Sequence, residues 1–189
     1  MKKQRDNYTF LTHAPVHRVI VSMAVPTIIS MLVTSIYGMV DTYYVGQINT
    51  QSTAAVGISF SIMTIIQAIG FFFGHGSGNY ISRMLGAKRT DEAKYMAATG
   101  LVGSVAFGLA VAVVGLAFLS DICIFLGSTE TILPYTERYL GIILVGAPFM
   151  TGAFTLNNQM RFQGNAKYAM YGILSGVVLN VVLAPILIF

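Results

Sequence analysis

Five long apolar stretches, separated by short charged segments, set the strongest limit on what this chain can fold into. Each stretch exceeds the roughly 20 residues that an α-helix needs to cross a hydrocarbon core. The bilayer interior offers backbone groups no water, and no ladder of short alternating strands is visible, so helices are expected. The predicted spans are Val19–Val45, Thr53–Ser82, Ala93–Leu119, Thr131–Met160 and Tyr168–Phe189. The sequence therefore predicts an all-α, polytopic membrane helix bundle that follows a short N-terminal segment, residues 1–18.

The composition argues against a soluble domain. Hydrophobic residues make up 55% of the 189 residues and charged residues only 10%, which is too little charge for a water-exposed surface. A soluble fold would expose large apolar patches, which soluble monomers rarely tolerate. The single cysteine, Cys123, excludes an intrachain disulfide and a cysteine metal cluster. We expect the bilayer, rather than nucleic acid, to be the partner that the net charge of +4 reflects.

The basic residues fall on one side of the predicted topology. Ten of the eleven Lys and Arg residues lie in the N-terminal segment or in the second and fourth connections: Lys2, Lys3, Arg5, Arg18, Arg83, Lys88, Arg89, Lys94, Arg161 and Lys167. Arg138 alone falls on the other side. The positive-inside rule then predicts a cytoplasmic N-terminus in a cell membrane, most simply a bacterial or archaeal inner membrane.

Six of the seven acidic residues lie in or beside the predicted connections, whereas Asp41 is predicted to lie inside an apolar helix. A carboxylate there costs about 3 kcal/mol on insertion scales, so it is read as functional by default. Ser30, Thr34, Tyr37, Asp41 and Tyr44 recur at steps of four and three, which gathers them on one helix face. The alternative is that Asp41 lies at the outer interface, solvated and inert. A functional Asp41 could exchange protons, because burial favours the neutral form of a carboxyl group. It could instead bind a hard cation such as Na⁺ together with hydroxyl and amide oxygens.

The fifth span carries a row of small residues that ends near a carboxamide. Gly172, Gly176, Asn180 and Ala184 recur at steps of four, a spacing that permits close helix packing. Asn180 would project into a helix interface. Asn180 and Asp41 are both predicted to lie in the outer half of the membrane. It could join Asp41 in one site, or it could simply bond to a neighbouring helix.

The other polar motifs within the spans do not match known catalytic patterns. The residues two positions either side of Ser77 are His75 and Asn79, whereas a nucleophile elbow needs glycine at both. Gly70, Gly74, Gly76 and Gly78 at the end of the second span are predicted to serve close helix packing. In the fourth span, Pro148 predicts a kink, and the polar run Asn157–Gln163 is predicted to mark the inner interface or to line a vestibule. We therefore expect no enzyme active site, no cofactor and no resident metal.

Four segments together resemble the multidrug and toxic compound extrusion family. They are Ser35–Gln47 (SIYGMVDTYYVGQ), Gly74–Ala93 (GHGSGNYISRMLGAKRTDEA), Asn157–Lys167 (NNQMRFQGNAK) and Gly176–Phe189 (GVVLNVVLAPILIF). The resemblance implies twelve helices in two six-helix lobes, of which this chain would be most of the first lobe, residues 19–189. It also implies a secondary transporter that exports organic, often cationic, drug-like compounds by H⁺ or Na⁺ antiport with alternating access.

The resemblance assigns roles to particular residues. Asp41 would bind the coupling ion, with Asn180 and Tyr139 as partners, and Tyr37, Thr34 and Asn157 would line the substrate cavity. The family usually has an acidic residue where this chain has Ala184. Alanine can neither ligate nor titrate, so Na⁺ binding near Asp41 is expected to be weak or absent.

A lipid-linked oligosaccharide flippase of a related superfamily is the alternative function. That function would require several basic residues inside the cavity to hold a pyrophosphate. None of the basic residues falls in the middle of a predicted span, which disfavours the flippase. The last apolar run stops at Phe189 without a basic anchor, so we expect the chain to be a fragment whose second lobe is missing.

Overall fold

The computed structural model of the chain describes residues 9–11 and 13–188, with side chains described as far as Leu183. Its helices run α2 Val16–Gly46, α3 Thr50–Gly86, α4 Thr90–Ala117, α5 Leu119–Phe125, α6 Leu133–Phe162 and α7 Ala166–Ile188. Five of these, all but α5, are long and apolar enough to span a membrane. The predicted all-α membrane bundle is therefore confirmed.

The helix boundaries depart from the predicted spans in one place that hydropathy did not reveal. The predicted third span continues to Leu119, but α4 ends at Ala117 and the short helix α5 follows. The cysteine side chain of Cys123 in α5 is fully buried against Leu140 and Leu144 of α6. The buried Cys123 thus attaches α5 to α6, whereas Ile124 and Phe125 of the same helix are exposed.

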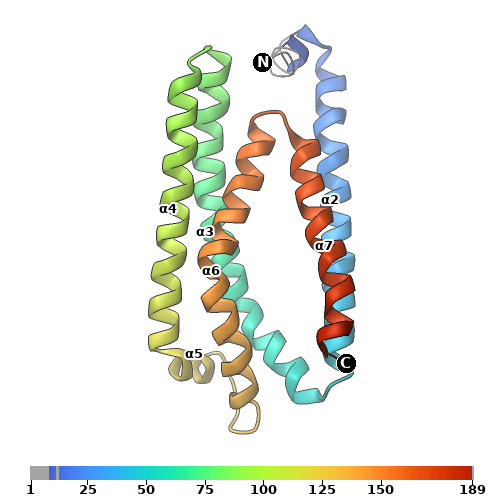
Figure 1. Cartoon of the computed structure of the whole chain (residues 1–189), viewed down its shortest axis with the longest axis vertical. Helices are drawn as coiled ribbons and strands as arrows, with labels where there is room; N and C mark the ends of the chain where they lie inside the picture. Colours follow the sequence, from blue (N-terminus) through green and yellow to red (C-terminus); the bar gives the residue numbers. More distant parts are fainter. Residues whose placement is uncertain (1–8, 12, 189) are drawn as a thin grey trace.

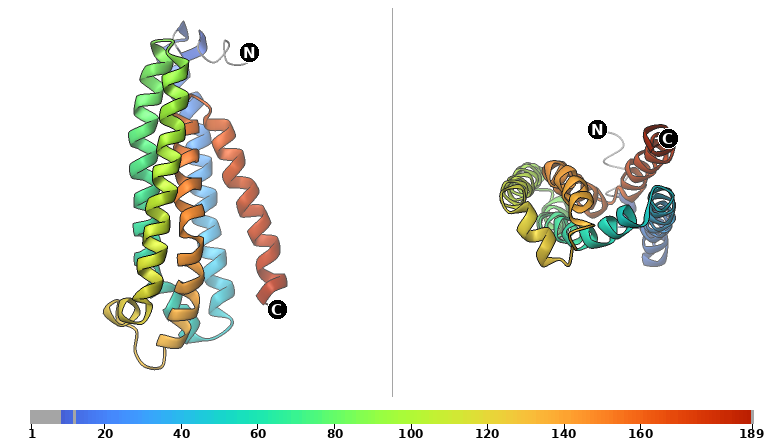
Figure 2. Two further views of the ribbon diagram at one scale, coloured as in Figure 1. Left: turned by 60° about the vertical axis from the view of Figure 1, so that its left-hand side comes forward. Right: turned by 90° about the horizontal axis from the view of Figure 1, so that it is seen from below.

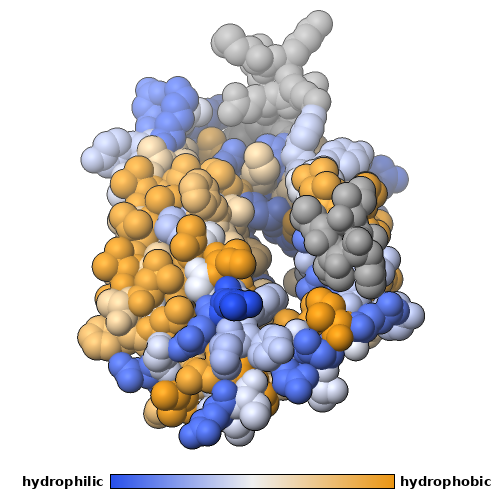
Figure 3. All heavy atoms as spheres, turned by 60° about the horizontal axis from the view of Figure 1, so that its bottom comes forward, coloured by the Kyte–Doolittle hydropathy of each residue, from blue (hydrophilic) through white to orange (hydrophobic). Residues whose placement is uncertain are grey.

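The helices form two groups (Figure 1). Helices α3, α4 and α6 pack closely along their lengths, whereas α2 packs mainly on α7, which lies far from it in the sequence. Only sparse contacts join α2 to α3 and α6 to α7. Seen from one end, the two groups stand apart (Figure 2), and the space-filling view shows a hollow between them (Figure 3). We call this space the central hollow.

The two ends of the bundle differ in charge. The start of α2, the α3–α4 connection and the α6–α7 connection lie together at one end (Figure 1), and these segments carry most of the basic residues. We call this the inner end and the opposite one the outer end. The arrangement agrees with the alternation predicted from the basic residues, and the cytoplasmic location of the inner end stays a prediction.

Glycine allows α3 to approach α6. A Cβ atom built on Gly74 would lie 2.8 Å from the Cβ atom of Asn158 and 3.2 Å from the Cα atom of Thr155. Gly70 meets Phe154 and Gly78 meets Phe162 in the same way. The predicted packing role of the glycine run is thus confirmed for these three residues. It is wrong for Gly76, which has open space around it.

Candidate functional site

The polar face of α2 carries the predicted site. The hydroxyl group of Ser30 donates to the carbonyl oxygen of Pro26 at 2.8 Å, and that of Thr34 donates to the carbonyl oxygen of Ser30 at 2.8 Å. These bonds return each hydroxyl group to its own helix, which places less demand on neighbouring helices. The opposite face carries Ile29, Leu32 and Ile36, which are exposed and so available to lipid. The predicted division of α2 into a polar face and an apolar face is confirmed.

Three ionisable side chains lie near one another toward the outer ends of α2 and α6. Asp41 and Tyr37 of α2 are half-buried, and so is Tyr139 of α6. Tyr139 lies close enough to Asp41 and Tyr37 for their charges to interact, and Tyr37 is in the same relation to Asp41. Sequence spacing could relate Tyr37 to Asp41, but only the tertiary structure brings Tyr139 of α6 near them. We call these three residues the acidic site.

Asp41 lies close to the outer end of α2. Helix α2 has 31 residues, which at 1.5 Å per residue is about 46 Å, longer than a hydrocarbon core of about 30 Å. Asp41 lies about 8 Å from the outer end of this helix. The half-buried carboxyl group therefore lies near one end of a helix that is longer than the apolar layer.

The chemistry available to the acidic site is that of oxygen ligands. A carboxylate accepts hydrogen bonds only, and each tyrosine hydroxyl group can donate to it. The same oxygen atoms could instead face a hard cation. A search of the described residues finds no group of three or more His, Cys, Asp or Glu side chains that could hold a metal ion. Any cation would therefore rely on one carboxylate and neutral oxygens.

Asn157 does not join the acidic site. Its amide nitrogen donates to the carbonyl oxygen of Ala169 in α7 at 3.0 Å, and its amide oxygen accepts from Nε of Arg161 at 3.0 Å. It lies about 27 Å from Tyr139 along α6. Asn157 is therefore separate from Tyr139 and Asp41, and its predicted role in lining the substrate cavity stays a prediction. Asn157 instead joins α6 to α7 at the inner end.

Of the remaining predicted residues, Thr34 and Asn180 have exposed side chains. Thr34 is exposed on α2. Asn180 is exposed on α7, the helix that pairs with α2, so its role as a partner of Asp41 stays a prediction. The side chain of Ala184 lies outside the part of the chain that the structure describes.

Part of the polar run at the end of α6 lies inside the bundle, not at the membrane interface. Asn158 and Gln159 are buried, with exposed fractions of 8% and 2%, so they do not mark the membrane interface. The amide nitrogen of Gln159 lies 2.9 Å from Oγ of Ser77 in α3 and 3.1 Å from the carbonyl oxygen of Ala97 in α4. These bonds hold three helices together at the inner half of the bundle. The sequence feature that comes closest to indicating these bonds is the presence of a glycine-rich stretch in one span and a polar run in another.

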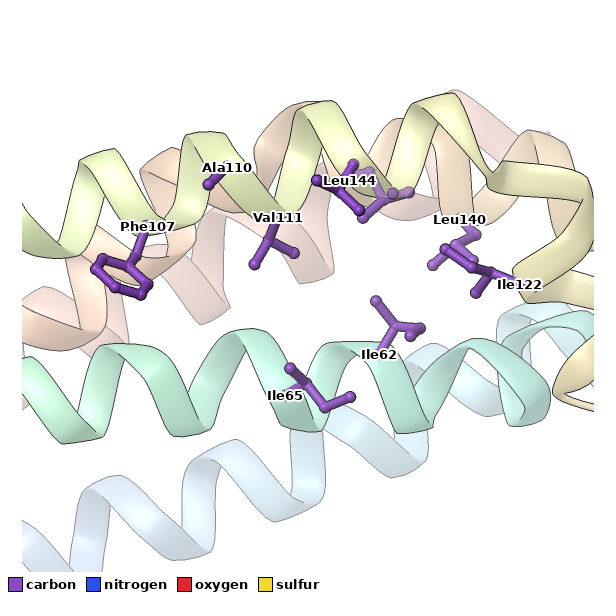
Figure 4. A pocket seen from close by; sticks show the side chains of 10 residues that line it. Ile62, Ile65, Phe107, Ala110, Val111, Ile122, Leu140 and Leu144 are labelled. Atoms are coloured by element: carbon purple, nitrogen blue, oxygen red, sulfur yellow. The ribbon is translucent and has the colours of Figure 1, made fainter.

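A separate apolar cavity of about 320 Å³ lies between α3 and α4 toward the outer end. Figure 4 shows Ile62 and Ile65 of α3 facing Phe107, Val111 and other side chains of α4, with Leu140 and Leu144 of α6 beside them. Its lining includes no polar side chain. It therefore offers no group that could bind an ion or fix a polar ligand, and it is distinct from the acidic site.

Comparison with known proteins, by sequence and by structure, finds the family that the sequence resembles. The MatE family model matches residues 26–186. Multidrug export protein MepA of Staphylococcus aureus (strain MRSA252) is 37% identical over 136 residues, which cover 72% of this chain and 30% of that protein. The protein of the same name from Staphylococcus haemolyticus (strain JCSC1435) matches at 37% identity over the same shares.

Solved structures agree in fold. A crystal structure of MATE in complex with MaD3S superposes with a TM-score of 0.83 at 28% identity, covering 89% of this chain and 38% of that one. A multidrug resistance MATE family transporter of the MOP superfamily, in an outward-facing conformation, gives 0.85 at 28% identity, covering 90% and 38%. The chain thus spans about a third of the length of the relatives it matches.

Proposed function

The chain belongs to the MatE family and is a multi-pass membrane protein, and from that premise we propose that it forms part of a secondary transporter that exports organic, often cationic, compounds. The single observation that carries the proposal is the acidic site, in which Asp41 stands with Tyr37 and Tyr139 beside the central hollow. Relatives of this chain are named multidrug export proteins. Because those relatives are more than twice as long as this chain, the transporter would need a second lobe to complete its cavity.

The coupling ion binds at Asp41 in this proposal. An ion that drives export must enter from outside, and Asp41 lies five residues before Gly46, the last residue of α2, at the helix end that the charge pattern predicts to be outer. Ion binding can move the transporter between its outward-open and inward-open states only if the two states bind the ion with different affinity. The sparse contacts of α2 with α3 support such a change, because α2 and α7 can shift relative to the close-packed α3, α4 and α6.

We propose H⁺ as the coupling ion in preference to Na⁺. Helix α7 contains no Asp or Glu, since Ala184 stands where the family usually has an acid. A single carboxylate with neutral hydroxyl oxygens gives Na⁺ a poor ligand set, because a hard cation favours several charged or carbonyl oxygens. Protonation of Asp41 requires no second acid. Either ion would remove the negative charge that otherwise resists burial.

The test uses the full-length transporter in proteoliposomes with separately imposed H⁺ and Na⁺ gradients. Efflux of a fluorescent organic cation driven by the H⁺ gradient alone is expected. Asp41→Asn should abolish that efflux and leave membrane insertion intact, because asparagine keeps the shape and loses the charge. The matched control is Thr42→Val, since the hydroxyl group of Thr42 is exposed and bonds only within α2. Undiminished gradient-driven efflux in Asp41→Asn would refute the coupling role.

A further inference from the structure

A second ionisable side chain, His75, lies within a membrane-spanning helix. It stands about 16 Å from the inner end of α3 and its side chain is exposed in the bundle. Ionisable residues at such depth are rare, and they usually face a cavity or a substrate pathway. The acidic site does not use His75, which lies in the inner half of the molecule whereas Asp41 lies in the outer half.

Two phenylalanine rings contact this imidazole, and a third contacts one of them. The ring centroid of His75 lies 5.5 Å from that of Phe71 and 5.7 Å from that of Phe162, in edge-to-face geometry. Phe71 in turn meets Phe154 of α6 at 5.7 Å, again edge to face. We call these four residues the aromatic cluster. Edge-to-face contacts leave ring faces uncovered, and such faces can receive another aromatic ring or a cation.

The aromatic cluster faces the central hollow. On α3, the glycine row faces α6, and Phe73 packs against Phe107 of α4 on one side of that row. His75 follows Gly74 by one residue, about 100° around the helix, on the side away from Phe73. On α6, Asn157 reaches α7. The cluster therefore lies at the seam of α3 and α6 on the side toward α2 and α7, as the arrangement of helices in Figure 2 allows.

One imidazole nitrogen of His75 forms a hydrogen bond to the backbone, and the other can accept a hydrogen bond from a ligand. Nδ1 of His75 lies 2.8 Å from the carbonyl oxygen of Phe71. Because a carbonyl oxygen can only accept, Nδ1 must carry the proton of this bond. In the neutral ring Nε2 then has a free lone pair, held in a fixed direction by the Nδ1 bond. The cluster thus combines ring faces with one oriented hydrogen-bond acceptor.

We propose that the aromatic cluster is an inner binding subsite for aromatic amines among the exported compounds. The aromatic ring of the compound packs on Phe71 and Phe162, and its N–H group donates to Nε2 of His75. The inference rests on the proposed function, since it names the class of compound that the central hollow receives before release at the outer end. It assigns a specificity to His75 that mere helix packing would not require.

The experiment measures equilibrium binding to the full-length transporter in nanodiscs, without any ion gradient. The probes are ethidium, which carries aromatic amino groups, and tetraphenylphosphonium, an aromatic cation with no N–H group. His75→Phe keeps an aromatic ring and removes the acceptor. It should weaken ethidium binding about five- to tenfold, as expected for one lost hydrogen bond, and change tetraphenylphosphonium binding less than about twofold. His75→Leu serves if His75→Phe does not assemble.

Two further variants test whether the ring of Phe162 contacts the bound compound. Phe162→Leu should weaken both probes, because both use the ring face. Phe72→Leu is the matched control, since Phe72 is 76% exposed and its ring pairs with Phe73 outside the cluster; it should weaken neither probe. Wild-type affinity of His75→Phe for ethidium, or equal losses for both probes, would overturn the subsite.

Failure of the subsite and failure of the proposed function give different results. If the transporter exports nothing under any gradient, the proposed function fails whatever the two probes bind. If efflux occurs and His75→Phe still binds ethidium as the wild type does, only the subsite fails.

Discussion

The hydroxyl oxygen of Thr155 in α6 lies 3.1 Å from the backbone carbonyl oxygen of Gly70 in α3, and both atoms are buried. The same hydroxyl oxygen lies 2.7 Å from that of Ser104 in α4. Because a carbonyl oxygen can only accept, Thr155 donates to Gly70 and accepts from Ser104. One side chain therefore ties three helices together at a point where glycine lets the backbones approach. These two hydrogen bonds stabilise the packing of α3, α4 and α6 beside the central hollow.

Thr155→Val should destabilise the full-length transporter by about 1 kcal/mol, the usual scale for a hydrogen bond between membrane helices. Valine keeps the shape of threonine but leaves the carbonyl group of Gly70 and the hydroxyl group of Ser104 without this partner. Thermal unfolding in detergent measures the change. Thr99→Val is the control, because the exposed Thr99 hydroxyl group bonds only to Tyr95 of its own helix. Equal stability of the two variants would contradict the proposed tie.

Gly74→Ala should separate α3 from α6, whereas Gly76→Ala should not. A Cβ atom at position 74 meets the backbone of α6 at 3.2 Å, but at position 76 it meets nothing within 4 Å. Overpacking of this kind costs about 1–3 kcal/mol. Alanine at an open helix position gains helix propensity by up to about 1 kcal/mol. The two variants should thus move the thermal midpoint in opposite directions, and a parallel shift would count against the packing role.

Tyr139→Phe should strengthen the apparent affinity for the coupling H⁺ about three- to tenfold, because a hydroxyl group that donates to the Asp41 carboxylate favours its charged form over its protonated form. Phenylalanine fills the same space and removes only the hydroxyl group. The measurement is the concentration of coupling ion that gives half-maximal efflux in proteoliposomes. Tyr95→Phe is the control, because Tyr95 is 76% exposed on α4. If the two variants need the same ion concentration, Tyr139 does not belong to the ion site.

Lys88→Gly should stabilise the α3–α4 connection by about 1 kcal/mol. Lys88 has a φ angle of 61°, a conformation that costs an L-residue roughly 1–2 kcal/mol and glycine nothing. The bonds from Lys88 N to the Leu85 carbonyl oxygen (3.1 Å) and from Arg89 N to the Met84 carbonyl oxygen (2.9 Å) require this turn. Ala87→Gly is the control, because Ala87 has a φ angle of −79°, and it should gain no stability. Thermal unfolding compares the two, and a loss of stability in Lys88→Gly would refute the strain.

The site could be predicted in part. The charge of Asp41 stands out because a carboxylate within an apolar stretch is costly wherever the helix packs, so its importance follows from the local sequence. The step of four to Tyr37 is equally local, because helix periodicity alone puts the two on one face. Tyr139 was named only through a family resemblance. Its nearness to Asp41 depends on how α6 and α2 cross, which no local pattern encodes.

Asn157 and His75 illustrate why local patterns fall short. Nearly every face of a membrane helix is apolar, so hydrophobic periodicity does not separate the lipid side from the protein side. The sequence therefore did not reveal that Asn157 turns to α7 while Gln159 turns to α3 and α4. For the same reason, His75 could be rejected as a catalytic residue yet not placed among Phe71, Phe154 and Phe162.

The sequence by itself determined the five spans, their alternation and the ionisable group of the first one, because hydropathy and charge act on each segment separately. The tertiary structure decided which helices pair and what each polar side chain meets. Those choices depend on shape: glycines such as Gly74 let backbones approach, and buried groups such as Thr155 bond only where a neighbour offers an acceptor. Close packing and buried hydrogen bonds are properties of two surfaces together, so they exist only once the helices have met.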